Sequence, residues 1–302
     1  MKIIVTHVSP DLDGIASIWL VKKYLPGWNE AVCKFVSAGK RLKGFENTER
    51  IIETNGKDEV IHVDTGLGPL DHHQIDSVAI SAISLTKDYV LKEYSRSNPE
   101  MVKHDKWKYK KEAIARMAKV IIDIDHFQEI FWQDPANDHH EFGLLNILDG
   151  LKIEKPNQDK QYVEFGCKAL DALLHEFENK IWAEDEIKNK GIIFETSFGK
   201  GIGLETINDE VVKLAQKMGF LIVVRKDPRK GYARIKTMPD SEKKKNSIDL
   251  TPVYNKLKSL DPDAHWFLHI SKKMLLNGSS KSPDFKPTKL SLADIIKELE
   301  KL

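Results

Sequence analysis

The chain has 302 residues, of which 41% are apolar, and a net charge of +1. This length predicts two domains of roughly 150 residues each, and the apolar content can fill a core in both, which excludes disorder as the main state. The longest apolar run, Phe220 to Val224, is far short of the roughly 20 residues that cross a bilayer, so we expect a soluble protein without a membrane partner. The run Ile3 to Val5 is too short for a signal peptide, and Cys33 and Cys167 form no disulfide framework, which favours the cytoplasm.

The charge is divided unequally along the chain. Residues 1–185 hold 24 Lys and Arg against 31 Asp and Glu, whereas residues 186–302 hold 23 against 15. An acidic half suits cations and a basic half suits a polyanion. This asymmetry hints at a metal site that faces a ligand bearing phosphate.

The amino-terminal part alternates predicted strands and helices. Residues 3–6 read as a buried strand, and residues 15–24 as a helix that Pro26 and Gly27 end. The next predicted elements are a strand at 31–36, a helix at 44–54 and a strand at 60–64. This order predicts a parallel sheet flanked by helices, whose ligands lie at the carboxyl ends of the strands.

The rest of the chain is expected to complete this domain and form a second, smaller α/β domain. The expected helices are 79–94, 110–123, 161–182, 208–218 and 291–302. The expected strands are 192–196, 220–225, 232–236, 265–270 and 274–276. Residues 95–108 read as a loop and the charged stretch 182–191 as a linker, which gives predicted domains of 1–186 and 187–302 with the active site in the cleft between them.

The first motif whose side chains could bind a ligand or take part in catalysis directly follows the first strand. Its sequence, His7-Val-Ser-Pro-Asp11-Leu-Asp13-Gly14, places an imidazole and two carboxylates on one short turn. Nitrogen and carboxylate ligands suit Mn²⁺ or a similar divalent ion. The alternative is that Asp11 or Asp13 merely caps the helix from Ile15.

Further candidate ligands follow the third strand. Asp64 stands at its end, and Asp71-His72-His73-Gln74 comes seven residues later. An acid beside a histidine can fix the imidazole tautomer for metal binding. The two motifs together favour a metal site over a solvated turn.

A last carboxylate is expected at the end of the helix that precedes residue 126. Asp125 is preferred over Asp123 for this role. Acids are disfavoured at the carboxyl end of a helix by the helix dipole, so a cation nearby would explain one there.

These motifs together resemble those of the DHH phosphoesterase superfamily, which includes RecJ-type nucleases, oligoribonucleases, cyclic-dinucleotide phosphodiesterases and family II pyrophosphatases. The spacing of Asp64 from Asp71-His72-His73-Gln74 is most similar to the MYG-type branch of metal-dependent exonucleases. That branch tends to carry Asp-Asn-Gly where this chain has Asp125-His126-Phe127.

The resemblance implies a two-metal centre, with Mn²⁺ favoured and Mg²⁺ as the alternative. One ion would be held by His7, Asp11 and Asp64. The other would be held by Asp13, Asp64, His72 and Asp125. Two ions roughly 3.5 to 4 Å apart can share a hydroxide nucleophile and stabilise the leaving oxygen. His73 would contact phosphate or act as the leaving-group acid, and Asp71 would orient His72.

In the second half the resemblance points to a substrate-binding segment. A Phe-Leu-His strand that ends at His269 precedes a loop with Gly278, Ser279, Ser280 and Lys281, whose backbone and charge would meet a phosphate. The Gly-Gly-Gly-His signature of many relatives is absent. His269 is equally suited to the core.

Other motifs rank lower. Asp138-His139-His140 reads as a helix cap with exposed histidines, with an auxiliary ligand set as the rival interpretation. The glycines of 198–203 read as a plain turn rather than a phosphate loop, and Lys243 to Lys245 as a solvated charge run rather than a nucleic-acid contact.

The expected function is metal-dependent hydrolysis of phosphodiesters in RNA or short oligonucleotides, from the 3′ end as the resemblance implies. The second hypothesis keeps the chemistry but takes pyrophosphate, a nucleotide or a cyclic dinucleotide. The third is a non-catalytic nucleotide-binding or nucleic-acid-binding module. The oligomeric state, including a homo-oligomer, is left open.

Overall fold

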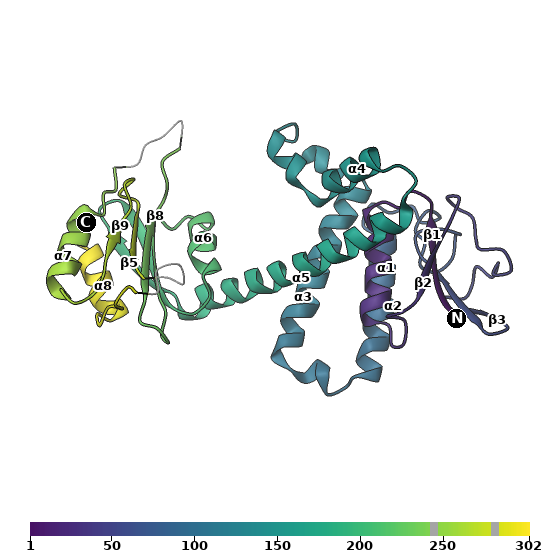
Figure 1. Ribbon diagram of the computed structural model, residues 1–302, viewed down its shortest axis with the longest axis horizontal. Coiled ribbons are helices and arrows are strands. Elements are labelled where there is room, and N and C mark those ends of the chain that lie inside the picture. The colour runs from purple at the N-terminus through teal and green to yellow at the C-terminus, as the bar shows by residue number, and fades with distance from the viewer. Residues whose placement is uncertain (242–246, 279–283) are drawn as a thin grey trace. The chain divides into compact units, whose positions relative to one another are not determined.

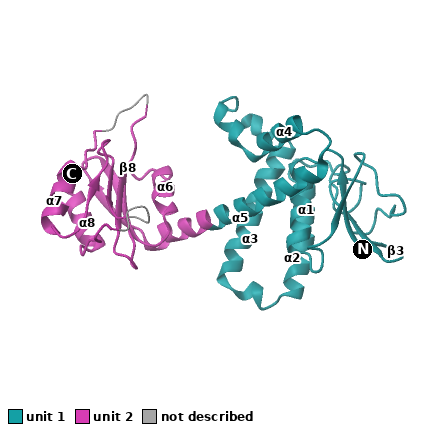
Figure 2. Cartoon of the chain, viewed as in Figure 1, with its two compact units in different colours: residues 1–178 teal, residues 179–302 magenta. Residues whose placement is uncertain are grey.

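The computed structural model describes residues 1–241, 247–278 and 284–302, and divides into two compact units, residues 1–178 and 179–302 (Figures 1 and 2). Helix α5 (Asp159–Lys190) contains the division. The charged stretch at 182–191, predicted to be a linker, is therefore helical as far as Lys190. Its apolar residues Ala183 and Ile187 are buried in the core of the second unit, which explains why the helix continues.

The first unit contains a four-stranded sheet in the order β2 (Val32–Val36), β1 (Lys2–His7), β4 (Asp58–His62) and β3 (Glu53–Asn55). Strand β1 pairs in parallel with β2 and β4, whereas β3 is antiparallel to β4, so the sheet is mixed. Because β1 and β4 are parallel, the residues that follow them meet at one edge of the sheet. His7 and Asp64 share this edge.

The predicted helix at 44–54 is wrong, since these residues form loop and the start of β3. A buried ion pair gives the physical reason. Glu53 is only 5% exposed, binds Arg41 and accepts a hydrogen bond from the Asn47 backbone N–H at 2.8 Å. Arg41 also donates to the carbonyl of Gly66 at 2.9 Å. This pairing of buried charges overrides the helical periodicity and ties the loop to the segment after β4.

The first unit also contains helices, of which α1 contacts strand β1 of the sheet. They are α1 (Leu12–Tyr24), α2 (Ala82–Ser97), α3 (Asp105–Asp125), α4 (Leu144–Glu154) and the first part of α5. Short 3-10 helices lie at Met101–Lys103, Gln128–Phe131 and Asp138–Phe142. Helix α1 contacts β1, α2 and α3, so nearly all of its residues are buried. Its amino terminus thereby becomes a rigid support for Asp11 and Asp13.

The second unit is built on a six-stranded sheet. The strand order is β5 (Ile192–Thr196), β6 (Gly199–Glu205), β7 (Ile222–Lys226), β8 (Ala233–Thr237), β10 (Met274–Asn277) and β9 (Phe267–Leu268). Among the described strands of this second sheet, only β6 and β7 pair in parallel. Helix α6 (Glu210–Lys217) lies on one face, and α7 (Thr251–Leu260) and α8 (Leu292–Leu299) lie on the other (Figure 1). The unit is α/β, as expected.

The glycine-rich segment 198–203, predicted to be a turn, forms most of strand β6. Its glycines serve close packing within the core. A Cβ atom at Gly201 would lie 2.3 Å from the Phe194 ring, and one at Gly203 would lie 2.7 Å from Ile296. These contacts explain the glycines without a phosphate ligand. Helix α7 was not predicted.

None of the helices in the described part of the chain is both long and apolar enough to span a membrane. Helix α5 has the length, but its charged side chains give it a low mean hydropathy.

Candidate metal centre

Side chains from three segments meet at the edge of the sheet where β1 and β4 end. The Nε2 atom of His7 lies 3.3 Å from Oδ2 of Asp64 and 3.6 Å from Oδ2 of Asp11. His7 ends β1, Asp11 precedes α1, and Asp64 follows β4. The parallel pairing of β1 with β4 brings these residues together, as the strand order predicts.

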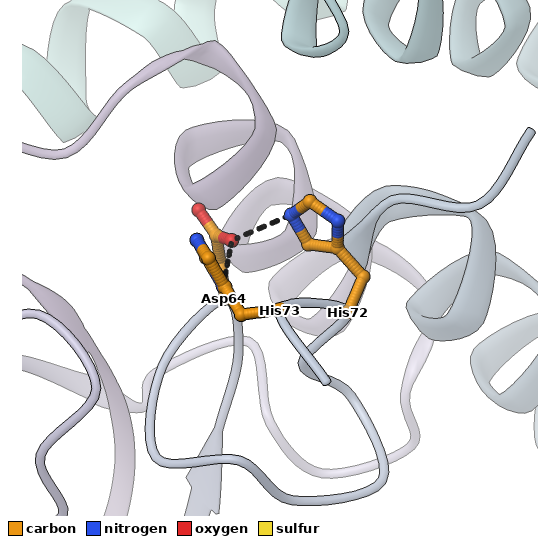
Figure 3. Close-up of side chains that lie close together, drawn as sticks. All are labelled: Asp64, His72 and His73. Atoms are coloured by element: carbon orange, nitrogen blue, oxygen red, sulfur yellow. Dashed lines mark ion pairs between the residues drawn. The ribbon is translucent and has the colours of Figure 1, made fainter. Parts of the chain in front are cut away.

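A second group of ligand atoms shares Asp64. The Nε2 atom of His72 lies 3.4 Å from Oδ2 of Asp125, 3.6 Å from Oδ1 of Asp64 and 3.8 Å from Oδ2 of Asp13. Asp64 therefore faces His7 with one carboxylate oxygen and His72 with the other. Figure 3 shows the ion pairs of Asp64 with His72 and His73. Three groups bring their ligand atoms close enough together to hold a metal ion, namely His7 with Asp11 and Asp64, His72 with Asp64 and His73, and His72 with Asp125 and His126.

Two atoms of this cluster have unmet bonding capacity. Nε2 of His72 and Oδ2 of Asp125 are buried, and neither has a hydrogen-bond partner among the residues that the structure describes. A buried polar atom without a partner is costly. Because the two atoms face each other across 3.4 Å, one cation between the side chains would satisfy both. The nitrogen and carboxylate donors fit a divalent ion such as Mn²⁺.

The close approach of the cluster favours glycine at position 14. A Cβ atom there would lie 2.9 Å from Oγ1 of Thr6 and 3.1 Å from Oδ2 of Asp64. Any side chain at this position would push on the carboxylate that the two groups share. The glycine in the motif thus makes room for Asp64.

Backbone strain gathers around the cluster. The non-glycine residues Ser9, Asp64, Leu67 and Phe127 have left-handed φ angles of 51 to 54° and each lies within three residues of a cluster side chain. The backbone N–H of Asp64 donates to the carbonyl of Leu70 at 3.0 Å, which fixes this conformation. Strained backbone that the surrounding structure enforces is common at functional sites.

Asp11 fills both roles that its sequence position suggests. Its Oδ1 accepts a hydrogen bond from the backbone N–H of Gly14 at 3.0 Å and caps α1, while its Oδ2 faces His7. A capping carboxylate and a metal ligand are therefore compatible in one side chain, because each function uses a different oxygen.

Asp13 is held by the amino terminus of α2. Its carboxylate accepts hydrogen bonds from the backbone N–H groups of Ala82 and Ile83, both at 2.7 Å, and from the hydroxyl of Ser81 at 3.0 Å. The helix dipole of α2 further favours the negative charge. Asp13 thus links α1 to α2 beside His72, and its role as a metal ligand stays a prediction.

Asp71 orients His73 rather than His72, which corrects the expectation from the sequence. Its Oδ1 lies 2.6 Å from Nδ1 of His73, and its Oδ2 accepts a hydrogen bond from the backbone N–H of Leu67 at 2.7 Å. The geometry of the turn gives the reason, since the backbone N–H of His73 also donates to Oδ1 of Asp71. The His73 side chain is 58% exposed and is available to a substrate.

At the end of α3 the structure separates the two candidate carboxylates. Asp125 lies in the cluster, whereas Oδ1 of Asp123 binds Nζ of Lys119 at 2.5 Å on the helix surface. His126, which sequence reasoning passed over, also lies here. Its Nε2 is 3.8 Å from Oδ2 of Asp125 and 2.9 Å from the Ile80 carbonyl. The sequence could have indicated His126, because it directly follows Asp125.

The carboxylates hold protons on the histidines of the cluster. Burial lowers the pKa of His7, but its hydrogen bonds with Asp11 and Asp64 outweigh this effect and raise the pKa to about 11. Burial raises the pKa of Asp11, but the bond from His7 and the Gly14 N–H outweigh it and lower the value to about 2. Lys152 of α4, which the sequence did not single out, contributes to this lowering.

In the second group, too, a neighbouring carboxylate raises the pKa of a histidine. The Asp64 carboxylate raises the pKa of His72 to about 9 against the effect of burial. Burial raises the pKa of Asp125 to about 6 and, with repulsion from neighbouring carboxylates, places that of Asp13 well above its usual range. A divalent cation would replace these protons as the counter-charge.

Of the candidates in the predicted substrate-binding segment, the structure describes His269 and Gly278. His269 and Gly278 belong to the second unit, where Nδ1 of His269 lies 2.8 Å from the Ser271 hydroxyl and a Cβ atom at Gly278 would lie 2.4 Å from the Tyr232 ring. Ser279, Ser280 and Lys281 lie outside the described residues, as do Lys243 to Lys245.

The second Asp-His-His motif does not provide the expected cap. Asn137, rather than Asp138, accepts the capping hydrogen bond from the backbone N–H of His139, at 3.0 Å. His139 is exposed and His140 is partly buried. Neither joins a potential metal-binding group within the described ranges.

A scan against protein-family models matches no family, and a search of curated proteins finds no match. The resemblance to the DHH superfamily therefore rests on the motifs themselves and stays a prediction.

Proposed function

We propose that this chain is a metal-dependent phosphodiester hydrolase with a two-metal centre in its first unit. One observation carries the proposal. Asp64 directs its two carboxylate oxygens toward two different groups of ligand atoms, and the second group contains the unpartnered Nε2 of His72 and Oδ2 of Asp125. A carboxylate shared in this way is suited to bridge two cations.

The proposed ligands follow from this geometry. His7, Asp11 and Asp64 would hold one ion, and Asp64, His72, Asp125 and Asp13 would hold the other. When bound, a pair of divalent ions activates water at neutral pH and neutralises the charge of a phosphoryl group. Mn²⁺ is the proposed metal, with Mg²⁺ as the alternative.

His73 is the proposed contact to the substrate. Its Nδ1 is engaged by Asp71, which leaves Nε2 of this exposed ring to meet a phosphoryl oxygen or to donate a proton to the leaving oxygen. Asp71 acts through His73 by fixing the orientation of its ring. The backbone N–H of Leu67 in turn holds Asp71.

The proposed substrate is RNA or a short oligonucleotide, cleaved from the 3′ end. The test is an assay of the purified chain with Mn²⁺ on short single-stranded RNA, pyrophosphate and a cyclic dinucleotide. We expect loss of terminal nucleotides from RNA. If RNA stays intact while a small phosphate compound is consumed, the nuclease proposal fails and the hydrolase proposal stands.

Two variants on helix α3 form a matched pair that tests whether the metal centre carries the hydrolysis. Asp125→Asn should lower the rate by at least about a hundredfold, because it removes a charge from the metal group. Asp123→Asn changes the same side chain two residues earlier, on the helix surface, and should leave the rate unchanged. Equal rates for both variants would refute the assignment of the centre.

A further inference from the structure

A groove lies between helices α2 and α3 of the first unit. The two helices contact each other along the chain, and residues 98–104 join them (Figure 1). The α2–α3 groove has a volume of about 290 Å³, close to the lower limit of roughly 300 Å³ for small-molecule pockets. Three lysines line it, Lys87 and Lys92 from α2 and Lys111 from α3, against the single acid Asp88.

The surface around this groove is basic, although the amino-terminal half of the chain is acidic. Residues 87–119 hold ten Lys and Arg against five Asp and Glu. The acids that neighbour the groove residues in the sequence each pair with one cation. These ion pairs, at 2.7 to 3.2 Å, are Asp88 with Lys87, Glu93 with Arg96, and Glu112 with Arg116. Lys92 and Lys111 are exposed, and neither pairs with an acid in the described part of the chain.

The composition of the groove fits a strand of nucleic acid. Positive charge without a counter-ion attracts an anion, and here it comes from both walls of the groove. The ring of Trp107 also lines the groove and is stacked on Tyr94, with centroids 4.8 Å apart and 19° between the ring planes. Proteins bind single-stranded nucleic acid with this combination, because lysines meet the phosphates and an aromatic ring stacks on a base.

The same surface lacks the features of a helix that binds a membrane. Such a helix inserts exposed apolar side chains into the lipid. Residues 87–119 are all described by the structure, and among them Met101 is the one large apolar residue that is mostly exposed, at 55%. The surface therefore favours a nucleic acid strand over a lipid headgroup as the source of the phosphates.

Both helices run from the groove to the proposed metal centre. The backbone N–H of Ala82, at the start of α2, donates to Asp13, and α3 ends at Asp125. At about 1.5 Å of rise per residue, Lys87 and Ser95 lie about 8 and 20 Å from Ala82 along α2. Because a stacked strand advances about 3.4 Å per nucleotide, the groove lies about two to six nucleotides from the metal centre.

We infer that the α2–α3 groove binds the phosphate backbone of a single-stranded nucleic acid, with Lys92 and Lys111 as its principal contacts. When one phosphate of the strand is held at the metal centre, the groove holds a segment about two to six nucleotides away. This placement rests on the proposed function, whereas binding of the strand requires no hydrolysis. The groove would give the chain a preference for a strand over a dinucleotide.

The test is fluorescence anisotropy with the full chain, metal removed by chelation, and a labelled single-stranded RNA of about 12 nucleotides. The double variant Lys92→Ala with Lys111→Ala should bind this RNA at least about fivefold more weakly at low salt. The slope of log Kd against log salt concentration should also fall by about 1.4, because each phosphate contact on a single strand contributes about 0.7. A dinucleotide, which is too short to reach the groove, should bind both chains equally.

Two control variants separate charge from structure. Lys92→Arg with Lys111→Arg keeps the positive charges and should keep the affinity for RNA within about twofold. Lys34→Ala with Lys57→Ala removes the same charge from exposed lysines that do not line the groove, and should leave the salt slope unchanged. Alanine favours helices, so circular dichroism should show a folded chain for the groove variant.

Three results would overturn the inference. The first is an unchanged affinity and salt slope in Lys92→Ala with Lys111→Ala. The second is an equal loss of affinity in the Lys34 and Lys57 control. The third is binding of the wild-type chain to phosphatidylserine vesicles but not to the RNA.

A second assay separates this inference from the proposed function. Hydrolysis of bis(p-nitrophenyl) phosphate by the wild-type chain with Mn²⁺ reports on the metal centre alone, because this ester is too short to reach the groove. If the chain hydrolyses the ester but binds RNA independently of Lys92 and Lys111, only the inference fails. If the chain binds RNA through these lysines but hydrolyses no phosphodiester, only the proposed function fails.

Discussion

Replacement of Gly14 by alanine tests whether Asp64 is the shared element of a metal centre. The new Cβ atom would lie 3.1 Å from Oδ2 of Asp64 and 2.9 Å from Oγ1 of Thr6, and normal contacts begin near 3.4 Å. The carboxylate must therefore shift by a few tenths of an ångström. A displacement of this size in a ligand shell costs about ten- to a hundredfold in metal affinity.

The effect on stability should be much smaller than the effect on metal binding. Gly14 lies in the first turn of α1 with an ordinary helical φ, so alanine gains about 0.5 to 1 kcal/mol from helix propensity. Local crowding costs about 1 to 3 kcal/mol. We therefore expect a net loss in the free energy of unfolding of about 0 to 2.5 kcal/mol, and a folded protein.

Gly150 provides the matched control for this substitution. It lies within α4, and no atom lies within 4 Å of the Cβ that alanine would add. Gly150→Ala should stabilise the chain by about 0.5 to 1 kcal/mol without changing metal affinity. Mn²⁺ affinity is measured by titration calorimetry, and stability by urea denaturation without metal. Wild-type Mn²⁺ affinity in Gly14→Ala would refute the reasoning.

Three more predictions concern protons. The pKa values of His7 and His72 are raised to about 11 and 9, so both rings carry a proton at pH 7.5 that Mn²⁺ must displace. Mn²⁺ binding should therefore release about two protons, measured by calorimetry in buffers of different ionisation enthalpy, and the affinity for Mn²⁺ should rise with pH. Binding of Mn²⁺ without proton release would contradict this prediction. Burial and the charge of Arg41 lower the pKa of His62 from 6.5 to about 4 in the folded chain. Protonation of His62 therefore favours the unfolded state, and about 3 kcal/mol of the free energy of unfolding that is present above pH 6.5 should be lost as the pH falls to 4. Urea denaturation at both pH values should show that His62→Gln lacks this loss. Asp71→Asn should lower the turnover rate about tenfold through His73 and leave Mn²⁺ affinity within twofold, and a parallel loss of both would instead place Asp71 among the ligands.

The sequence was informative where local pattern and chain order determine the structure. Short apolar runs predicted β1, β2 and β4, and the parallel order of β1 and β4 placed His7 and Asp64 at one edge. The dipole argument selected the end of α3 as a site for a carboxylate near a cation. These predictions needed only periodicity and the direction of each strand.

Features that depend on distant partners could not be predicted from the sequence. The pairing of Glu53 with Arg41 replaces a predicted helix with loop and strand, because a buried carboxylate outweighs local propensity. The glycines of β6 resembled a loop because Phe194 and Ile296, which need their space, lie elsewhere in the sequence.

The partner of Asp71 was also beyond sequence reasoning. Both His72 and His73 are adjacent or nearly adjacent to Asp71, and only the path of the turn decides which ring the carboxylate meets.

The most direct test of the two-metal centre is anomalous diffraction from a crystal of this chain soaked in Mn²⁺. Two peaks should appear on opposite sides of the Asp64 carboxylate, one beside His7 and Asp11 and the other beside His72 and Asp125. The absence of both peaks in a soaked crystal, or peaks that do not contact Asp64, would contradict the account.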